Sequence, residues 1–371
     1  MQKKCILFLS NGGLFTGKLI GAPISASGEL VFTTGMVGYS EAMTDPSYFG
    51  QILIFAYPLI GNYGIPQLSV GSNDAIPKGF ESEKIHAAAV IMTVDSPEAY
   101  HWNSFQSLDA WLKKENVPGV VGLDTRHLIH LIRSEKNLLG FVEPREQGDD
   151  TSQKAFFNPS ETDILQHVSS KNRRLIGRGK TRIALIDCGV KWNIIRQLLA
   201  LDCEIELLPW TTDLKTVDCD GWLLSNGPGD PGRTGDLKDQ ISETLLKDKR
   251  PVLGICLGHQ LLALAAGGAT KKMSYGHRSH NQPVAEVNTR RGYITSQNHG
   301  FVVDQETLSE DWEPWFLNAN DGTIEGMKHR SKPFCSVQFH PEAAGGPRDT
   351  GWIIDQFMVK VSSKIRTYPC L

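Results

Sequence analysis

The stretch Pro251-Val-Leu-Gly-Ile-Cys256-Leu-Gly-His-Gln260 places a cysteine directly after a short apolar run and before a helix-forming segment. Gly254 and Gly258 flank Cys256, two residues away on either side. A side chain at the sharp turn between a buried strand and a helix is presented at the sheet edge, and small residues on both sides relieve the crowding. The positive end of the following helix favours a thiolate. We therefore predict a strand, a tight turn and a helix, with Cys256 as an enzymatic nucleophile.

The sequence around this stretch alternates between strand-like and helix-like segments. Short apolar runs lie at 182–186, 204–208, 221–225 and 251–255, and helical stretches at 190–200, 236–247 and 258–266 separate or follow them. Continuous apolar strands joined by helical crossovers predict an α/β domain with a mostly parallel, doubly wound sheet and an active site at the carboxyl ends of its strands. After residue 267 the pattern changes to hairpin-like strands, and the last of them, 334–339, leads into His340.

A polar segment separates this domain from the amino-terminal part of the chain. Residues 143–150 are polar and contain helix breakers, and 173–182 is strongly basic. Upstream, short strands mix with helices near 107–115 and 126–134, which predicts a smaller mixed α+β domain. We predict an amino-terminal domain at 1–142, a linker region at 143–180 and the α/β domain at 181–371.

A cysteine nucleophile needs a base, and His340 with Glu342 supplies a candidate pair. Glu342 can fix the tautomer of the imidazole, which is the third role in a Cys-His-acid triad. Taken alone, Cys256 is better explained as a buried small hydrophobe, and His340 as a hydrogen-bonded core histidine. The two together favour the catalytic interpretation.

The turn at Asn226-Gly-Pro-Gly-Asp-Pro231 follows another predicted strand. It contains a formal Gly-x-Gly-x-x-Gly, but Pro228 and Pro231 remove amide donors that a pyrophosphate would need, which argues against dinucleotide binding. A rigid turn whose remaining amides face a neighbouring strand end suits an oxyanion hole, with the amide of Leu257 as the second donor.

These three motifs, at 226–231, 254–260 and 340–342 in this order, resemble the signatures of class I (triad-type) glutamine amidotransferases. The resemblance implies hydrolysis of the side-chain amide of L-glutamine through a cysteinyl thioester, with transfer of ammonia to a synthetase. It assigns Cys256 as nucleophile, His340 as acid and base, and Glu342 as the residue that orients His340.

Blocks at 33–48, 57–64, 122–126 and 297–301 resemble the small-subunit family of carbamoyl-phosphate synthetase. This implies a large-subunit partner that makes carbamoyl phosphate from bicarbonate. ATP and magnesium are expected on that partner, because no Gly-x-x-x-x-Gly-Lys-Ser/Thr motif occurs here, and no cofactor or metal is expected on this chain. Carried over by position, the resemblance implies a glutamine pocket lined by Ser47, Gly227, Gly229, Leu257, Gln260, Asn298, Gly300 and Phe301.

The chain departs from the family pattern at an insertion, 67–79, and at 90–93, 100–103 and 279–280, none of which touches the triad. The changes between 67 and 103 bear on partner contacts and regulation. Two alternatives stay open: an amidotransferase subunit of another synthetase, which the 33–64 block disfavours, and a non-catalytic regulatory subunit, which the intact triad disfavours. The resemblance does not distinguish arginine, pyrimidine and specialised pathways.

Composition excludes several other classes of protein. The 371 residues carry a net charge of −3, which offers no basic face for nucleic acid. The seven cysteines form no Cys-x-x-Cys pair, so neither a disulfide framework nor a structural zinc site is expected. The only apolar run near the start, 5–9, is too short for a signal peptide or a membrane span, and we expect a cytoplasmic protein.

Overall fold

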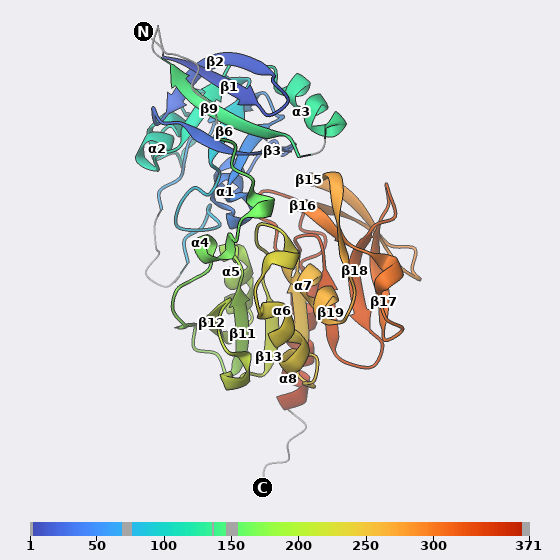
Figure 1. Ribbon diagram of the computed structural model, residues 1–371. Helices are drawn as coiled ribbons and strands as arrows, with labels where there is room; N and C mark the ends of the chain where they lie inside the picture. The colour runs from blue at the N-terminus through green and yellow to red at the C-terminus, as the bar shows by residue number, and fades with distance from the viewer. Residues whose placement is uncertain (1–2, 69–75, 136, 146–154, 366–371) are drawn as a thin grey trace. The chain divides into compact units, whose positions relative to one another are not determined.

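The computed structural model describes residues 3–68, 76–135, 137–145 and 155–365, and only their structure is considered below. The chain forms two compact units. The first comprises most residues up to Thr162, and the second begins at Asp163 (Figure 1). The division falls inside the predicted linker region 143–180. The last strand of the first unit, β9 (Leu139–Arg145), extends past residue 142, where we predicted the first domain to end.

The second unit is built on one ten-stranded sheet with the order β10-β12-β11-β13-β14-β19-β18-β17-β15-β16. Its strands are β10 (Arg174–Ile176), β11 (Thr181–Asp187), β12 (Cys203–Pro209), β13 (Gly221–Leu224), β14 (Val252–Ile255), β15 (Thr270–Glu286), β16 (Gly292–Val303), β17 (Trp312–Asn318), β18 (Ile324–His329) and β19 (Phe334–Val337).

The four strands β12, β11, β13 and β14 run parallel to one another, as the apolar runs predict, and β19 adds a fifth parallel strand. Burial explains their composition: β13 and β14 are buried along their whole length, so every position takes an apolar residue or glycine. Of the strands after residue 267, β15, β16, β17 and β18 are antiparallel, as predicted, and extend the same sheet. The last of them, β19, was predicted as a hairpin-like strand; it does pair antiparallel with β18, but its other edge joins the parallel strand β14. The antiparallel edge strand β10 was not predicted, because its three residues lie in the basic segment that we assigned to the linker region.

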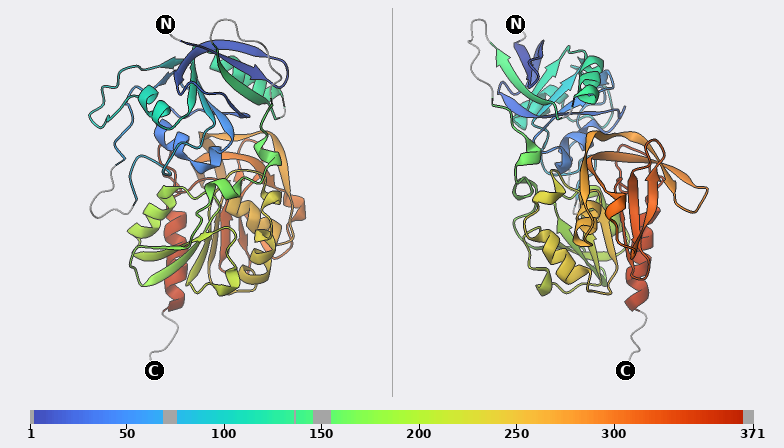
Figure 2. Two further views of the ribbon diagram at one scale, coloured as in Figure 1. Left: turned by 60° about the vertical axis from the view of Figure 1, so that its left-hand side comes forward. Right: turned by 45° about the vertical axis from the view of Figure 1, so that its right-hand side comes forward.

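Helices cover both faces of the parallel strands. These are α5 (Trp192–Ala200), α6 (Leu237–Gln240) with a π-helical continuation at Ile241–Leu245, α7 (Leu257–Ala265) and α8 (Trp352–Ile365); a short α4 (Leu165–Val168) precedes the sheet. In the right-hand view of Figure 2, α6 and α7 lie on one side of the sheet and α8 on the other. All of α7 except Leu264 is buried, which fits its role as a packing helix behind the sheet edge.

The first unit is a closed barrel with the strand order β1-β2-β8-β6-β4-β3-β9, in which β9 pairs with β1. The remaining barrel strands are β1 (Lys4–Leu9), β2 (Leu14–Gly21), β3 (Ala26–Thr33), β4 (Gln51–Phe55), β6 (Ala89–Met92) and β8 (Pro118–Val121). A two-stranded ladder joins β5 (Leu59–Ile60) and β7 (Val94–Asp95). Closure pairs every barrel strand on both sides, which removes exposed edges.

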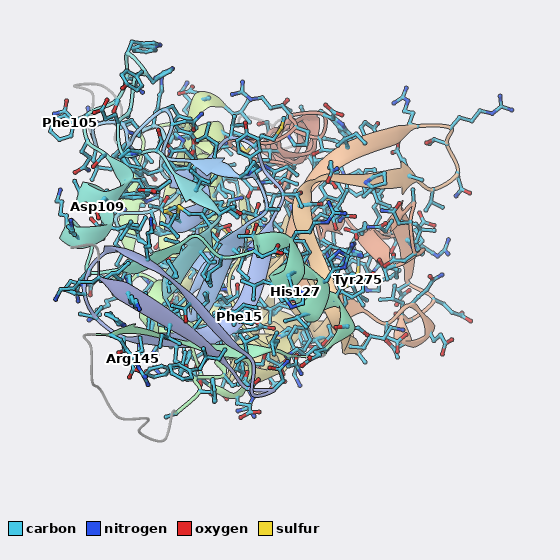
Figure 3. All side chains as sticks on the ribbon, turned by 90° about the horizontal axis from the view of Figure 1, so that it is seen from above. Phe15, Phe105, Asp109, His127, Arg145 and Tyr275 are labelled. Carbon is cyan, nitrogen blue, oxygen red and sulfur yellow. The ribbon has the colours of Figure 1, made fainter. Side chains whose placement is uncertain are left out.

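Three helices accompany the barrel: α1 (Tyr39–Thr44), α2 (Leu108–Lys114) and α3 (Thr125–Ser134). Asp109 of α2 accepts a hydrogen bond from the backbone amide of Gly21 at 2.8 Å. His127 of α3 packs against Phe15 of β2, with ring centroids 5.8 Å apart, and Figure 3 shows these two side chains near each other. The unit therefore mixes helices and strands, as predicted.

The insertion, the cysteines and the absence of a predicted membrane span can be compared with the described residues. Of the insertion 67–79, residues 69–75 lie outside the described residues. Six of the seven cysteines fall in the described part, and all six are free thiols. Among the described residues, no helix is both long enough and apolar enough to span a membrane.

Candidate active site

Cys256 occupies the turn between β14 and α7 with φ 53° and ψ −103°. This backbone conformation is rare for a residue with a Cβ atom and costs about 1–3 kcal/mol, which the surrounding structure must offset. The backbone amide of Cys256 donates to the carbonyl oxygen of Val337 in β19 at 2.8 Å, which anchors the turn to the sheet. The predicted nucleophile turn is thus present.

Gly254 and Gly258 are required by close backbone contacts at this turn. A Cβ atom on Gly258 would lie 2.2 Å from the carbonyl oxygen of Leu224, and one on Gly254 would lie 2.6 Å from that of Gly258. Neither contact can be relieved by a side-chain rotation, because both involve backbone atoms. The two glycines therefore let α7 start directly against the ends of β13 and β14.

The thiol of Cys256 is only 2% exposed and lies among polar groups. Its Sγ is 3.8 Å from the carbonyl oxygen of Asn298 and 3.6 Å from Nε2 of Gln338. Gln338 in turn accepts a hydrogen bond from Nε2 of Gln260 at 3.0 Å. The nucleophile is therefore held in a polar, nearly closed site at the sheet edge.

His340 and Glu342 form the predicted pair, and both are buried. Nδ1 of His340 lies 2.7 Å from Oε1 of Glu342, and Nζ of Lys191 lies 2.8 Å from the same oxygen. Nε2 of His340, the nitrogen on the far side of the ring, is buried and makes no hydrogen bond to the described residues. It is therefore free to exchange a proton with a reacting group.

The charges around this pair set its protonation. Burial and the Lys191 ammonium lower the pKa of His340, but the Glu342 carboxylate and Cys256 outweigh them and raise it to about 10. Burial raises the pKa of Glu342, but Lys191 and His340 outweigh it and lower the value to about 2. His340 is thus a cation next to a carboxylate at neutral pH, and Cys256 is close enough to contribute to that balance.

The carboxyl ends of four parallel strands meet at this site. Lys191 follows β11, Asn226 follows β13, Cys256 follows β14 and His340 follows β19. Leu257 is the first residue of α7, so its amide has no acceptor within the helix and is available to an oxyanion. The turn 226–231 is tied in by Asn226, whose Oδ1 accepts from the backbone amide of Lys191 at 3.0 Å.

Most residues implied for a glutamine pocket lie in this unit. Gly227 approaches the neighbouring chain so closely that a Cβ atom would lie 2.0 Å from the carbonyl oxygen of Cys188, and Gly229 adopts φ 93°. Gln260 donates from Nε2 to the carbonyl oxygen of Phe301 at 2.9 Å. Nδ2 of Asn298 is buried with no hydrogen-bond partner among the described residues, so it can serve a ligand.

Gly300 lies on β16 between Asn298 and Phe301, whose carbonyl oxygens contact Sγ of Cys256 and Nε2 of Gln260. Ser47 belongs to the first unit, where it lies in a short 3₁₀ helix, Pro46–Tyr48, and donates its amide to Asp45. The part that these residues play in binding glutamine stays a prediction.

Sequence reasoning missed Lys191 and Gln338. A signal for Lys191 was present, since it stands four residues after the buried strand that ends at Asp187, at the same sheet edge as the nucleophile. Gln338 lay inside a run that we predicted as strand to residue 339, whereas β19 ends at Val337. Its side chain is fully buried and bridges Gln260 and Cys256, a contact that spacing alone does not reveal.

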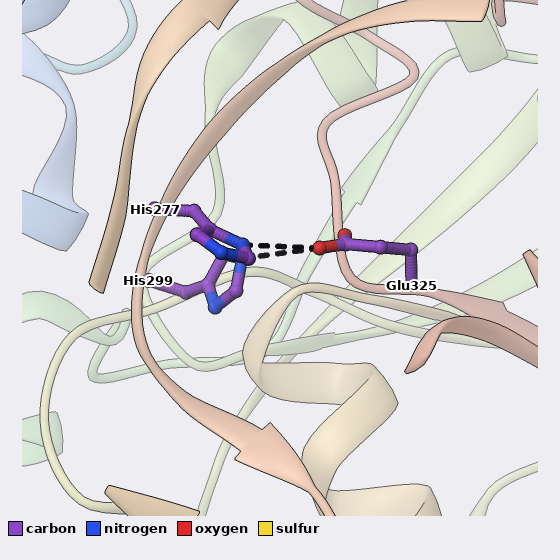
Figure 4. Close-up of side chains that lie close together, drawn as sticks. All are labelled: His277, His299 and Glu325. Atoms are coloured by element: carbon purple, nitrogen blue, oxygen red, sulfur yellow. Dashed lines mark hydrogen bonds and ion pairs between the residues drawn. The ribbon is translucent and has the colours of Figure 1, made fainter. Parts of the chain in front are cut away.

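One further cluster has the composition of a metal site. His277, His299 and Glu325 bring one ligand atom each to within 4.8 Å of one another, and all three residues are buried (Figure 4). They lie on β15, β16 and β18 of the sheet and do not include a triad residue. Hydrogen bonds within the protein already engage both histidines, as described further below.

Known proteins similar to the chain cover both units. Residues 184–360 match the family described as glutamine amidotransferase class-I, and residues 7–142 match the carbamoyl-phosphate synthase small chain, CPSase domain. The carbamoyl phosphate synthase arginine-specific small chain of Aspergillus clavatus is 42% identical over 364 residues, covering 97% of this chain and 80% of its own length.

Two further relatives align with nearly the whole chain, one a separate small chain and the other a much longer multifunctional protein. The protein of the same name from Yarrowia lipolytica is 42% identical, covering 95% of this chain and 81% of its own length. The multifunctional protein CAD of Squalus acanthias is 44% identical over 95% of this chain, which corresponds to 16% of that much longer protein.

The small-chain family thus matches the first unit and the amidotransferase family the second, and known small chains align with nearly the whole length of this chain. The nucleophile turn and the buried histidine–carboxylate pair lie within the amidotransferase match. The chain accordingly belongs to the carbamoyl-phosphate synthase small-chain family and is a glutamine-hydrolysing subunit of that enzyme.

Proposed function

We propose that glutamine hydrolysis takes place at Cys256, through a cysteinyl thioester, and that the ammonia passes to an ATP-dependent large subunit making carbamoyl phosphate from bicarbonate. The observation that carries this proposal is the strained Cys256 turn beside a buried His340 whose Nε2 has no partner among the described residues. A thiol and an imidazole in this arrangement suit acyl transfer.

In the first step, Sγ of Cys256 attacks the side-chain carbonyl carbon of glutamine. His340 holds the thiol proton and then donates it to the leaving nitrogen, which departs as ammonia. The amide of Leu257 and the turn at 226–231 stabilise the negative oxygen of the tetrahedral intermediate. Water, deprotonated by His340, then hydrolyses the thioester and releases glutamate. Glu342 orients His340 throughout, and Lys191 balances the charge of Glu342.

We assign Asn298 to the amino-acid end of glutamine, to which it can hydrogen-bond. The buried, unpaired Nδ2 of Asn298 supports its part in this assignment. The remainder of the pocket is lined by Gly227, Gly229, Leu257, Gln260, Gly300 and Phe301.

The partner chain supplies the rest of the reaction. We assign ATP and magnesium to the large subunit and no metal or cofactor to this chain. The protein acts in the cytoplasm, where a reducing environment keeps a catalytic thiol free.

Replacing the nucleophile separates the two half-reactions. Cys256→Ser, purified together with the large subunit, is expected to lose glutamine-dependent synthesis of carbamoyl phosphate and to retain synthesis from ammonium chloride. The serine variant removes the thioester and leaves the distant synthetase site intact. Undiminished synthesis from glutamine would show that another residue is the nucleophile.

A further inference from the structure

His277 lies between two carboxylates inside the second unit. Its Nδ1 is 3.1 Å from Oε1 of Glu325, and its Nε2 is 2.9 Å from Oδ2 of Asp321. The side chain of His277 is 8% exposed, that of Glu325 is fully buried and that of Asp321 is 40% exposed. Figure 4 shows the His277 and Glu325 side chains pointing toward each other; they come from β15 and β18, which β17 separates in the sheet.

This geometry favours a positively charged His277. An imidazole can donate from both ring nitrogens only when it is protonated, and carboxylates accept only. Burial lowers the pKa of His277, but Glu325 and Asp321 outweigh it and raise the value above its usual range. Burial raises the pKa of Glu325, and the His277 contact opposes this. Burial dominates, so the pKa of Glu325 is raised overall; an ionised Glu325 is part of the proposal, and its Oε1 receives the hydrogen bonds of both His277 and Nδ2 of Asn318, the latter at 3.2 Å.

His299 packs edge-on against His277, with ring centroids 5.0 Å apart and planes at 84°. Its Nδ1 lies 2.9 Å from the carbonyl oxygen of Phe301 and must carry a proton to donate there. Burial and the neighbouring charges of His277 and Arg278 keep the pKa of His299 well below its usual range. His299 is therefore neutral, and its single proton has two acceptors within reach: the carbonyl oxygen of Phe301 beside Nδ1, and Oε1 of Gln297, which lies 3.2 Å from Nε2. The bond to Phe301 forms when the proton is on Nδ1.

The Phe301 carbonyl joins this histidine to the catalytic thiol. The same oxygen accepts from Nε2 of Gln260, which also donates to Gln338, and Gln338 contacts Sγ of Cys256. Three residues before Phe301, the carbonyl oxygen of Asn298 is 3.8 Å from that Sγ. The backbone carbonyls of residues 298–301 thus contact both the His299 ring and the nucleophile.

We propose that His277, held as a cation between Glu325 and Asp321, is a positioning residue for glutamine binding. Its charge prevents a second proton on His299 and neutralises Glu325, so that His299 keeps its proton on Nδ1 and its bond to Phe301. This bond holds segment 298–301 in the shape that the glutamine pocket needs. The inference rests on glutamine hydrolysis at Cys256.

The alternative occupant of this cluster is a metal ion. A metal bound to Nδ1 of His277 would replace the proton that Nδ1 donates to Glu325. The amide nitrogen of Asn318 lies 3.3 Å from Nδ1 of His277 and 3.2 Å from Oε1 of Glu325, and so already fills part of the space between these ligand atoms. The observations therefore favour the ion pair.

Four variants of the full chain and one control variant, each assayed in complex with the large subunit, test the proposal. His277→Gln leaves Glu325 buried without its cation, which favours the His299 proton on Nε2, 3.2 Å from Oε1 of Gln297 and 3.9 Å from Oε1 of Glu325. The bond from His299 to Phe301 is then lost. We expect the KM for glutamine to rise about tenfold, with kcat changed less than about threefold. Glu325→Gln alone should raise KM less, because Asp321 still faces His277.

The double variant His277→Gln/Glu325→Gln removes both charges and should bring KM back to within about threefold of the wild-type value. A merely structural role predicts additive losses. Asp321→Asn should also raise KM, but less than His277→Gln does, because Asp321 is more exposed and water can replace part of its interaction. His329→Gln is the matched control. His329 lies on β18 together with Glu325, and among the described residues its side chain makes hydrogen bonds only with Ser331 and Lys332.

Unchanged KM in His277→Gln, or no recovery in the double variant, would overturn the proposal, as would a stoichiometric metal found by mass spectrometry in protein purified without chelators. Histidine labelled with ¹⁵N gives a readout independent of activity. At pH 7.5 we expect two protonated ring nitrogens on His277 and one, Nδ1, on His299, with His299 changing to Nε2 in His277→Gln. A neutral His277 would contradict the inference even if glutamine hydrolysis itself were absent.

Discussion

Lys191 and Glu342 form a buried ion pair beside His340, and this pair determines how strongly His340 holds its proton. The two charges act in opposite directions, since Lys191 lowers the pKa of His340 and Glu342 raises it. A change at either residue should therefore shift the titration of the same imidazole without touching the nucleophile.

Lys191→Met and Glu342→Gln are expected to move the basic limb of the pH profile of kcat/KM in opposite directions. The thiolate–imidazolium pair is active while His340 is protonated, so a higher pKa of His340 extends activity to higher pH. Lys191→Met removes a charge that lowers this pKa and should shift the limb upward; Glu342→Gln should shift it downward. Steady-state glutaminase assays between pH 6 and pH 11 would measure both, and shifts in the same direction would contradict this charge balance.

His340→Ala should reduce glutaminase turnover more than Glu342→Ala. Loss of the acid and base removes a factor of about 10²–10⁴, whereas the carboxylate orients the imidazole and does not itself carry the proton. Turnover is compared in variants that circular dichroism shows to be folded. Equal losses would place Glu342 on the path of the proton.

The element that positions the nucleophile is the β14–α7 turn. This turn could be predicted from the sequence because it needs glycine at 254 and 258. Cys256 has a positive φ, and α7 begins so close to the neighbouring strand that no side chain fits at either position. The strands on either side were readable because they are buried on both faces. Their apolar runs therefore contain no polar alternation that a surface strand would show.

Gly258→Ala is predicted to destabilise the protein by about 1–3 kcal/mol and to lower glutaminase activity, because the added Cβ meets a backbone carbonyl that no side-chain motion can clear. Gly292→Ala is the matched control, since the nearest atom to its Cβ is 3.6 Å away, an ordinary contact. Urea unfolding and activity are measured for both variants. Gly258→Ala with the stability and activity of the control would show that the turn relaxes.

On the scale of the whole molecule, the barrel unit contains no triad residue, although it makes up a large part of the chain. A subunit that makes ammonia for another active site wastes glutamine when it runs alone. We therefore predict slow hydrolysis by the isolated chain, faster hydrolysis with the large subunit bound, and a major contribution of residues 1–142 to that interface.

Glutaminase rates with and without the large subunit test this prediction. A carboxy-terminal fragment from about residue 180 that bound and responded like the full chain would exclude the interface role. Deleting residues 67–79 tests the insertion separately: unchanged binding and stimulation would identify it as a tolerated surface loop.

The sequence by itself determined the parallel strands, the Cys256 turn and the His340–Glu342 pair, because each depends on local patterns: buried apolar runs, glycines at fixed offsets, and two side chains two residues apart. Barrel closure, the edge strand β10 and the contacts of Lys191 and Gln338 depend on residues far apart in the chain. The cluster of His277, His299 and Glu325 comes from the paired strands β15 and β16 and from β18, which lies beyond β17, so only the assembled sheet brings the three side chains together. Tertiary structure alone decided these features, because strand pairing and burial create the distances and the desolvation that give those side chains their charges.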